Sequence, residues 1–137
     1  MKIVLDKGAY MPHRAHIYDA GLDLRAQSDG WLLPKCRRTF DTGVHIEIPK
    51  MCVGLMTSKS GLMAKHGITC RGTIDSGYTG SVKAVLFNHG WLPVKIKAAQ
   101  KIAQIVIIPI VTPDLELVDT LERTERGTGG FGSTGAF

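Results

Sequence analysis

Val44-His45-Ile46-Glu47-Ile48 is the stretch that decides the fold class of this chain. Apolar and polar residues alternate along it with a period of two, as in a half-buried β-strand, and Pro49 then ends the pattern. Short segments rich in Val and Ile recur between Gly, Pro, Asp and Asn residues, over 2–5, 20–26, 52–56, 82–87, 94–96, 102–110 and 115–118. Many short strands at this spacing predict an all-β domain of the sandwich, jelly-roll or β-barrel kind.

The segment from Ser60 to Gly67 departs from the β pattern. It begins with a residue type that caps helices, continues through good helix formers and ends at a glycine. We therefore expect a single short α-helix with Ser60 as its N-cap. A lone short helix in an all-β chain closes one end of the core or carries a site.

The composition bounds the class of protein and the class of partner. The chain has 137 residues, of which 44% are hydrophobic and 21% are charged, as is typical of a soluble single domain. Its formal net charge of +5 indicates an anionic partner, but Lys and Arg are scattered and form no basic block. A phosphorylated small molecule fits this distribution better than a nucleic acid does.

Cysteine usage and the N-terminal segment indicate the cellular compartment. Cys36, Cys52 and Cys70 are odd in number and lack C-x-x-C spacing, so neither a disulfide framework nor a zinc site is indicated. Residues 1–10 contain no signal-type apolar stretch, and no segment approaches the length of a membrane span. We expect a cytoplasmic protein (host cytoplasm if viral) with reduced thiols and with neither nucleic acid nor membrane as a partner.

The last twelve residues, Arg126 to Phe137, have the composition of a ligand-binding arm. Five glycines surround Phe131, Ser133 and Thr134, and Arg126 stands at the entrance. Successive glycine amides can form an anion-binding nest, and an arginine fork suits phosphate oxygens. A disordered Gly/Ser/Thr terminus is the alternative, and the tail alone leaves both interpretations open. The sequence thus predicts a single β domain over 1–125 and a flexible Gly-rich arm over 126–137.

Two further segments combine charge with backbone donors. Asp23 interrupts an apolar strand, either as an outward-facing surface residue or as a site residue, since burying an unpaired carboxylate is costly. Ser58-Lys59-Ser60-Gly61 offers a cation, hydroxyls and free amides at a helix start, and so either forms an anion site or is an ordinary solvated cap.

Polar residues also mark a turn and a strand near the end of the β domain. The stretch from Gly72 to Gly80 predicts a hairpin that carries Asp75 and Tyr78. Either both are ordinary turn residues, or the hairpin is a site in which backbone groups read the edge of a base and Tyr78 packs against a sugar. Gln104 interrupts the apolar run from Ile102 to Val106 and needs a buried partner or a ligand.

These five segments, in this order, resemble the five motifs of the trimeric dUTPase family (dUTP nucleotidohydrolases). They read A-G-L-D-L-R-A, S-K-S-G-L-M-A-K-H-G-I, G-T-I-D-S-G-Y-T-G, K-I-A-Q-I and R-G-T-G-G-F-G-S-T-G, and they span residues 20–135. The resemblance implies a jelly-roll homotrimer that hydrolyses dUTP to dUMP and pyrophosphate with Mg²⁺, each active site drawing on all three subunits. Such an enzyme keeps uracil out of DNA and supplies dUMP for dTMP synthesis.

The resemblance also implies a role for each motif residue. Asp75 would activate the attacking water, Gln104 would bond the α-phosphate and this water, and Asp23 would hold Mg²⁺ through water. Tyr78 would pack under the deoxyribose, and Phe131 would stack on uracil. The substrate-binding set comprises Lys59, Ser60, Gly61, Thr69, Gly72, Thr73, Ile74, Tyr78, Lys83, Arg126, Phe131, Gly132, Ser133 and Thr134.

The chain departs from the family pattern in three motifs. Lys59 stands where the second motif usually has an arginine, which keeps the charge but loses the bidentate fork. Ala99-Gln100-Lys101 replaces the usual Gly-Asp-Arg of the fourth motif, although Gln104 is retained. Gly77 replaces an acidic residue found in many members.

Two other functions are compatible with a chain of this type. A nucleotide-sensing regulatory protein of the same fold is one alternative. A dCTP deaminase of the related fold is another, but it would need a glutamate near the hairpin, where only Asp75 stands.

Overall fold

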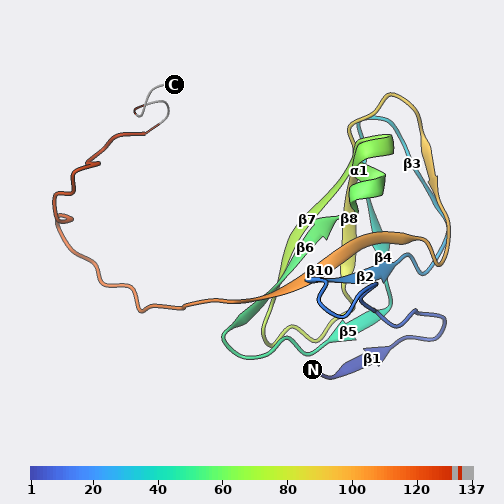
Figure 1. Cartoon of the computed structure of the whole chain (residues 1–137), viewed down its shortest axis with the longest axis horizontal. Helices are drawn as coiled ribbons and strands as arrows, with labels where there is room; N and C mark the ends of the chain where they lie inside the picture. Colours follow the sequence, from blue (N-terminus) through green and yellow to red (C-terminus); the bar gives the residue numbers. More distant parts are fainter. Residues whose placement is uncertain (131–132, 134–137) are drawn as a thin grey trace.

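The structure is a computed structural model, and it describes residues 1–130 and 133 (Figure 1). Within this part of the chain, short strands follow one another with one helix between them. In chain order the elements are β1 (Ile3–Leu5), β2 (Gly21–Arg25), β3 (Gly30–Leu32), β4 (Arg37–Asp41), β5 (Val44–Ile46), β6 (Cys52–Ser58), α1 (Ser60–His66), β7 (Ile68–Asp75), β8 (Lys83–Asn88), β9 (Val94–Ile96) and β10 (Lys101–Pro109).

The strands form one large curled sheet and two small ones. The large sheet has the order β2-β10-β6-β7-β8-β4, while β1 pairs with β5 and β3 pairs with β9. All of these pairs are antiparallel. Fully buried Leu24, Leu86 and Ile105 come from three strands of the large sheet, whereas Leu32 and Val44 come from the small sheets. One core therefore joins all three sheets, and the all-β prediction is confirmed.

The sequence located most of the described strands but missed β3, β4 and the first half of β7. The predictions over 2–5, 20–26, 52–56, 82–87, 94–96 and 102–110 correspond to observed strands. Strand β4 was not predicted because it buries only Phe40 among charged neighbours, and β3 is only three residues long. The predicted strand at 115–118 is wrong for the single chain, since these residues pair with no described strand.

Helix α1 begins at the predicted residue but is capped differently. Lys59, and not Ser60, is the N-cap, with extended dihedral angles and no side-chain hydrogen bond. Gly67 ends the helix in the left-handed conformation, at φ 64°, and donates to the carbonyls of Leu62 and Met63. The helix stands at one end of the sheet, where Leu62 packs against the core (Figure 1).

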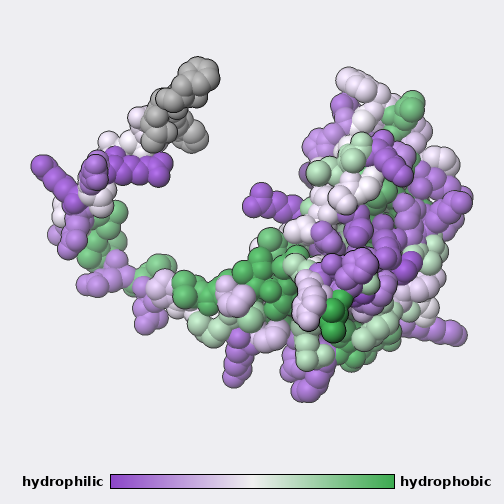
Figure 2. Space-filling model, in the orientation of Figure 1, coloured by the Kyte–Doolittle hydropathy of each residue, from purple (hydrophilic) through white to green (hydrophobic). Residues whose placement is uncertain are grey.

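After β10 the chain leaves the domain as an extended segment (Figure 1). This segment exposes large apolar side chains: Leu115 is 98% exposed and Leu117 is 101% exposed. Figure 2 shows further hydrophobic surface where the segment departs from the body. Exposed apolar surface of this extent marks a site of interaction with another molecule.

Two further features concern the cysteines and the hydropathy of the described helix. Cys36, Cys52 and Cys70 are all free thiols. Over the described residues, no helix reaches the length and apolar character needed to cross a membrane.

Candidate active site

Asp23 is a buried carboxylate held by two lysines. It lies in the middle of β2, between Leu22 and Leu24, and is only 5% exposed. Lys59 Nζ lies 2.6 Å from its Oδ1 atom and Lys101 Nζ lies 2.7 Å from its Oδ2 atom. The interpretation of Asp23 as a surface residue is therefore wrong, because paired cations make its burial tolerable.

The same contacts keep Asp23 ionised. Burial raises the pKa of this carboxyl, but the hydrogen bonds from Lys101 and Lys59 outweigh it and leave the pKa below the ordinary 3.8. Two cations beside one anion also leave the cluster with a net positive charge. Such a cluster can attract a phosphate while it orients the carboxylate.

Gln104 lies beside this cluster. It pairs with Asp23 on one neighbouring strand and with Thr57 on the other, and its side chain donates a long 3.5 Å hydrogen bond to the Ser58 carbonyl. Gly21 lies under it, and a Cβ there would approach Gln104 Oε1 to 2.5 Å, so only glycine leaves the amide in place. A cavity of about 280 Å³ is lined by Ala15, Asp19, Ala20, Gly21, Asp23, Lys59, Gln104 and Val106.

Asp75 and Tyr78 form a second group at the other end of the sheet. Asp75 is the last residue of β7, is exposed, and accepts a 3.2 Å hydrogen bond at its carbonyl from the Tyr78 amide. Tyr78 is 44% exposed, and its hydroxyl donates to the Ser81 carbonyl at 3.0 Å. Gly77 between them takes φ +93°, which a side chain would disfavour.

The predicted hairpin is longer and differently placed than the sequence indicated. Residues 68–75 all belong to β7, and the turn runs over 76–82. The pairing between β7 and β8 runs from Ile68 to Cys70 only, while β7 pairs with β6 from Arg71 to Asp75. The edge of β7 that faces β8 is therefore open beyond Cys70. Backbone donors and acceptors there suit recognition of a base edge.

The remaining predicted residues divide between these groups and the extended segment. Ser60 and Gly61 open α1, directly after Lys59. The Thr69 hydroxyl forms a hydrogen bond with the Nε2 atom of His89. Lys83 is paired in the sheet with Asp41 of β4, so it does not lie opposite the β7 residues from Thr69 to Ile74. Three further predicted residues, Gly72, Thr73 and Ile74, lie along the open edge of β7.

The arm residues fall partly outside the described part of the chain. Arg126 is exposed on the extended segment and donates from Nε to the Gly129 carbonyl at 3.1 Å. Ser133 is exposed as well. Phe131, Gly132 and Thr134 lie outside the described residues.

One site residue was not assigned from the sequence. Lys101 was noted only as a departure from the family pattern, yet it holds the second oxygen of Asp23. Its position three residues before Gln104 could have suggested that Lys101 lies near the same site. Spacing along the chain does not reveal the register shift between Lys101 and Ala103, however, and it is this bulge in β10 that turns the lysine toward β2.

Comparisons with known proteins identify the family of this chain. The family model described as dUTPase matches residues 7–135. A deoxyuridine 5'-triphosphate nucleotidohydrolase of Gloeothece citriformis is 42% identical over 134 residues, covering 96% of this chain and 92% of its own. One of Anaeromyxobacter is 48% identical over 119 residues, covering 85% and 81%.

Solved structures give the same result. The dUTPase of Staphylococcus bacteriophage 80alpha with dUPNHPP aligns with a TM-score of 0.91 and 32% identity, covering 98% of this chain and 97% of its own; it is described as controlling the transfer of virulence genes. A dUTPase variant from phage phi11 of S. aureus, described as coordinating a structural Mg(II) ion, aligns with a TM-score of 0.83 and 29% identity, covering 89% and 98%. The chain belongs to the dUTPase family.

Proposed function

We propose that this protein hydrolyses dUTP to dUMP and pyrophosphate. The observation that carries the proposal is the pairing of two groups in one dUTPase-family chain: a cationic, phosphate-sized cavity at Asp23, Lys59 and Gln104, and an open strand edge ending in Asp75 and Tyr78. The first group suits a triphosphate and the second suits a deoxyuridine. The role of each residue is part of the proposal.

The chemistry requires charge neutralisation and positioning more than covalent help. Lys59, with the amides that open α1 at Ser60 and Gly61, binds the phosphates. Gln104 bonds the α-phosphate and orients the attacking water. Asp75 is exposed at the end of β7, so it can accept the proton of this water without first leaving a buried partner.

The base and sugar are read by the second group. Backbone groups of β7 from Thr69 to Ile74, an edge that is open beyond Cys70, bond the uracil edge, and Lys83 lies on the neighbouring strand. Tyr78 packs under the deoxyribose and leaves no room for a 2′-hydroxyl, which excludes UTP.

Asp23 fits a magnesium ion held through water. A buried, ionised carboxylate beside a phosphate-sized cavity is the ligand type that Mg²⁺ uses together with substrate phosphates, and Asp19 lines the same cavity. The lysines occupy one direction on each Asp23 oxygen, and a carboxylate oxygen can still accept from a bound water. Bound Mg²⁺ would neutralise phosphate charge.

We propose that the β domain ends at residue 125 and that residues 126–137 form an arm that closes over the nucleotide. Arg126 then reaches the γ-phosphate, Phe131 covers the base, and Ser133 and Thr134, with Gly132, bond terminal phosphates. Exclusion of bulk water by the aromatic ring would strengthen each electrostatic contact beneath it.

Self-association as a homotrimer is supported by apolar surface. The sheet face that carries Asp75 and Gln104 also carries Leu55 and Val106, which pair with each other and are only half-buried. The extended segment exposes Leu115 and Leu117. Both surfaces would be covered in a trimer, which sedimentation should detect at about 45 kDa, against 14.9 kDa for one chain.

Turnover assays test the proposed activity. The protein is incubated with dUTP, dCTP or UTP and Mg²⁺, and pyrophosphate and ammonia are measured. Pyrophosphate from dUTP alone supports the proposal, whereas ammonia from dCTP would identify a deaminase. Binding without turnover would favour the nucleotide-sensing role, which the description of the phage 80alpha relative makes a specific second candidate.

A matched pair of variants tests the role of Asp75. Asp75→Asn should lose nearly all turnover, because the amide cannot accept the proton of the water. Asp29→Asn is the control: Asp29 accepts from the Ala98 amide through Oδ1, and asparagine keeps this acceptor. If Asp75→Asn retained full activity, the assignment of the base would be wrong.

A further inference from the structure

The turn over residues 76–82 is the element that sets where Tyr78 lies. It starts directly after Asp75, and a hydrogen bond from the Tyr78 amide to the Asp75 carbonyl closes its first part at 3.2 Å. A Cβ on Gly80 would collide with the Tyr78 ring, so the ring lies folded back over the turn. Whatever holds this turn therefore also positions Tyr78.

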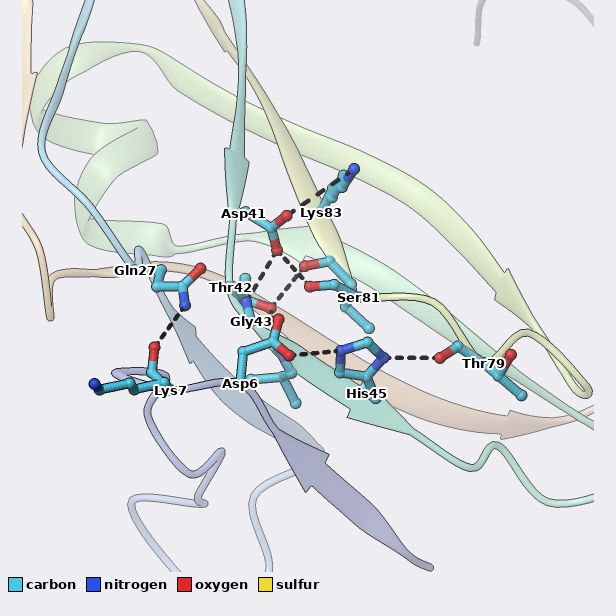
Figure 3. Close-up of polar contacts among 12 residues, drawn as sticks. Asp6, Lys7, Gln27, Asp41, Thr42, Gly43, His45, Thr79, Ser81 and Lys83 are labelled. Atoms are coloured by element: carbon cyan, nitrogen blue, oxygen red, sulfur yellow. Dashed lines mark hydrogen bonds and ion pairs between the residues drawn. The ribbon is translucent and has the colours of Figure 1, made fainter.

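The end of the turn is tied to the segment that joins β4 to β5. The Thr42 hydroxyl donates to the Val82 carbonyl at 2.6 Å, and the Val82 amide donates to the Val44 carbonyl at 2.8 Å. The Ser81 hydroxyl donates to the Asp41 carboxylate (Figure 3). This end is fixed by groups whose bonds do not change near neutral pH.

The middle of the turn is tied to one titratable side chain. His45 of β5 extends between the turn and the residue that follows β1, as Figure 3 shows. Its Nδ1 atom lies 2.8 Å from the Thr79 carbonyl oxygen, and its Nε2 atom lies 3.3 Å from Asp6 Oδ1. The ring thus bridges the turn to the N-terminal strand pair.

Both partners of His45 are acceptors. A carbonyl oxygen and an ionised carboxylate carry no proton to donate, and a neutral imidazole has a single N–H. A neutral ring would therefore direct a lone pair at Thr79 or at Asp6. Only the imidazolium form donates to both at once.

We propose that His45, as an imidazolium bonded to Thr79 and Asp6, is a positioning residue that holds the turn and Tyr78 in place for the deoxyribose. The inference rests on the proposed function for its effect on substrate, but the clamp itself is independent of it. Deprotonation of the ring leaves a single N–H for two acceptors, and the turn loosens in the fraction of molecules in which this N–H stays on Asp6 and the bond to Thr79 is lost.

The surrounding charges favour the protonated ring. The hydrogen bond to the Thr79 carbonyl, followed by the hydrogen bond and charge of Asp6 and the charge of Asp41, raises the pKa of His45 above its ordinary 6.5, although burial opposes them. The clamp is complete below the ordinary pKa and is lost as pH rises through the raised value. The other charged side chains around the ring are Lys2 and Glu47, which pair with each other at 3.4 Å, Lys50 on the same cavity wall, and Lys83, which lies 4.0 Å from Asp41.

An NMR titration of the full chain tests the clamp without using activity. With ¹⁵N-labelled protein, the His45 ring signals should titrate with a midpoint above 6.5, and the backbone amides of Tyr78 to Ser81 should shift with the same midpoint. Assignment comes from His45→Gln. If the ring titrates while these amides do not move, the ring does not hold the turn and the proposal is overturned.

Asp6→Asn is the matched variant. An asparagine amide can donate to Nε2 of a neutral ring, while Nδ1–H still donates to Thr79, so the clamp no longer requires the charge. The midpoint of His45 should fall below its wild-type value, because the hydrogen bond and the charge of Asp6 no longer favour the imidazolium, and the turn amides should keep their low-pH positions at high pH. An unchanged midpoint would remove Asp6 from the clamp.

Kinetics then connect the clamp to substrate. In the wild type the KM for dUTP should rise several-fold above the His45 midpoint with little change in kcat, and discrimination against UTP should fall in parallel. Asp6→Asn should flatten both profiles, and His45→Gln should show the high KM at every pH. His16→Gln, an exposed histidine, is the control and should keep the wild-type profile.

The outcomes separate the two proposals. Absence of dUTP turnover would contradict the proposed function but leave the NMR test of the clamp intact. Normal turnover with the same KM profile in the wild type, Asp6→Asn and His45→Gln would contradict the clamp alone. If His45→Gln does not fold, the wild type and Asp6→Asn still decide the question.

Discussion

Asp75 and Gln104 lie on the same face of the central sheet but toward opposite ends of it. Asp75 pairs with Val53 of β6, and Gln104 pairs with Thr57 of the same strand. Four residues along a strand and two strand spacings separate them by roughly 16 Å. A water and one phosphorus atom cannot contact both side chains across this distance, so we infer that the two residues serve active sites shared between copies of the chain.

Mixing two inactive variants should restore activity. Asp75→Asn and Gln104→Ala should each lose most turnover. In a mixed trimer, however, a site is complete when its Gln104 comes from an Asp75→Asn chain and its Asp75 comes from a Gln104→Ala chain. With random assembly of equal amounts into trimers, about one quarter of the sites are complete, so activity should reach about one quarter of the wild-type value. The measurement is pyrophosphate release after co-refolding. Activity no higher than the mean of the two variants would place both residues in one chain's site.

The Asp23 cluster should make stability depend on pH in the acid range. The pKa of Asp23 is lowered in the folded protein, so its ion pairs stabilise the fold above the unfolded pKa of 3.8 and are lost as pH falls through the lower folded value. Asp23→Asn should cost about 1–3 kcal/mol of unfolding free energy at pH 7. Urea unfolding should show this difference shrinking below pH 3.8. Asp114→Asn, at an exposed position, is the control, and a difference that stays constant down to pH 2 would exclude the cluster as its source.

Removing residues 126–137 should leave the fold intact and remove most of the turnover of dUTP. The last described strand ends at Pro109, and the core residues all precede it, so the truncated chain should fold. Its thermal unfolding midpoint should stay within about 2 °C of the full chain, because the buried core residues of the described part of the chain are all retained. Turnover of dUTP should fall at least about a hundredfold, since the arm supplies charge and water exclusion. Normal turnover by the truncated protein would reduce the arm to a solvated tail.

The thiols of Cys36 and Cys70 should react at very different rates. Burial raises the pKa of the Cys70 thiol to about 11, whereas Cys36 is exposed. Because the thiolate is the reactive form, a disulfide reagent at pH 8 should modify Cys36 rapidly and Cys70 only upon unfolding. Mass spectrometry of the labelled peptides gives the order of reaction. In Cys36→Ser the rapid phase should disappear, and rapid labelling of Cys70 in the folded protein would contradict its burial.

The local sequence pattern was sufficient to predict an element where the residues of that element alone favour its conformation. The alternation at Val44 to Ile48 predicted β5, and Gly67 predicted the end of α1 because the left-handed conformation at φ 64° favours glycine. Local pattern failed at 115–118, where the alternation is present but no described strand lies beside these residues to pair with them. It failed at β4 as well, because exposed charged residues on both sides of the strand hide the period of two.

The sequence by itself determined the all-β class, the family and which polar residues stand in the motifs of that family, because each of these depends on residue types and their order. The tertiary structure alone decided what surrounds them. Burial of Asp23 requires Lys59 from the start of α1 and Lys101 from β10, and the charge of His45 depends on acceptors at Thr79 and Asp6. The free energy of a charge depends on the groups within a few ångströms of it, and strand pairing, not spacing along the chain, brings those groups together.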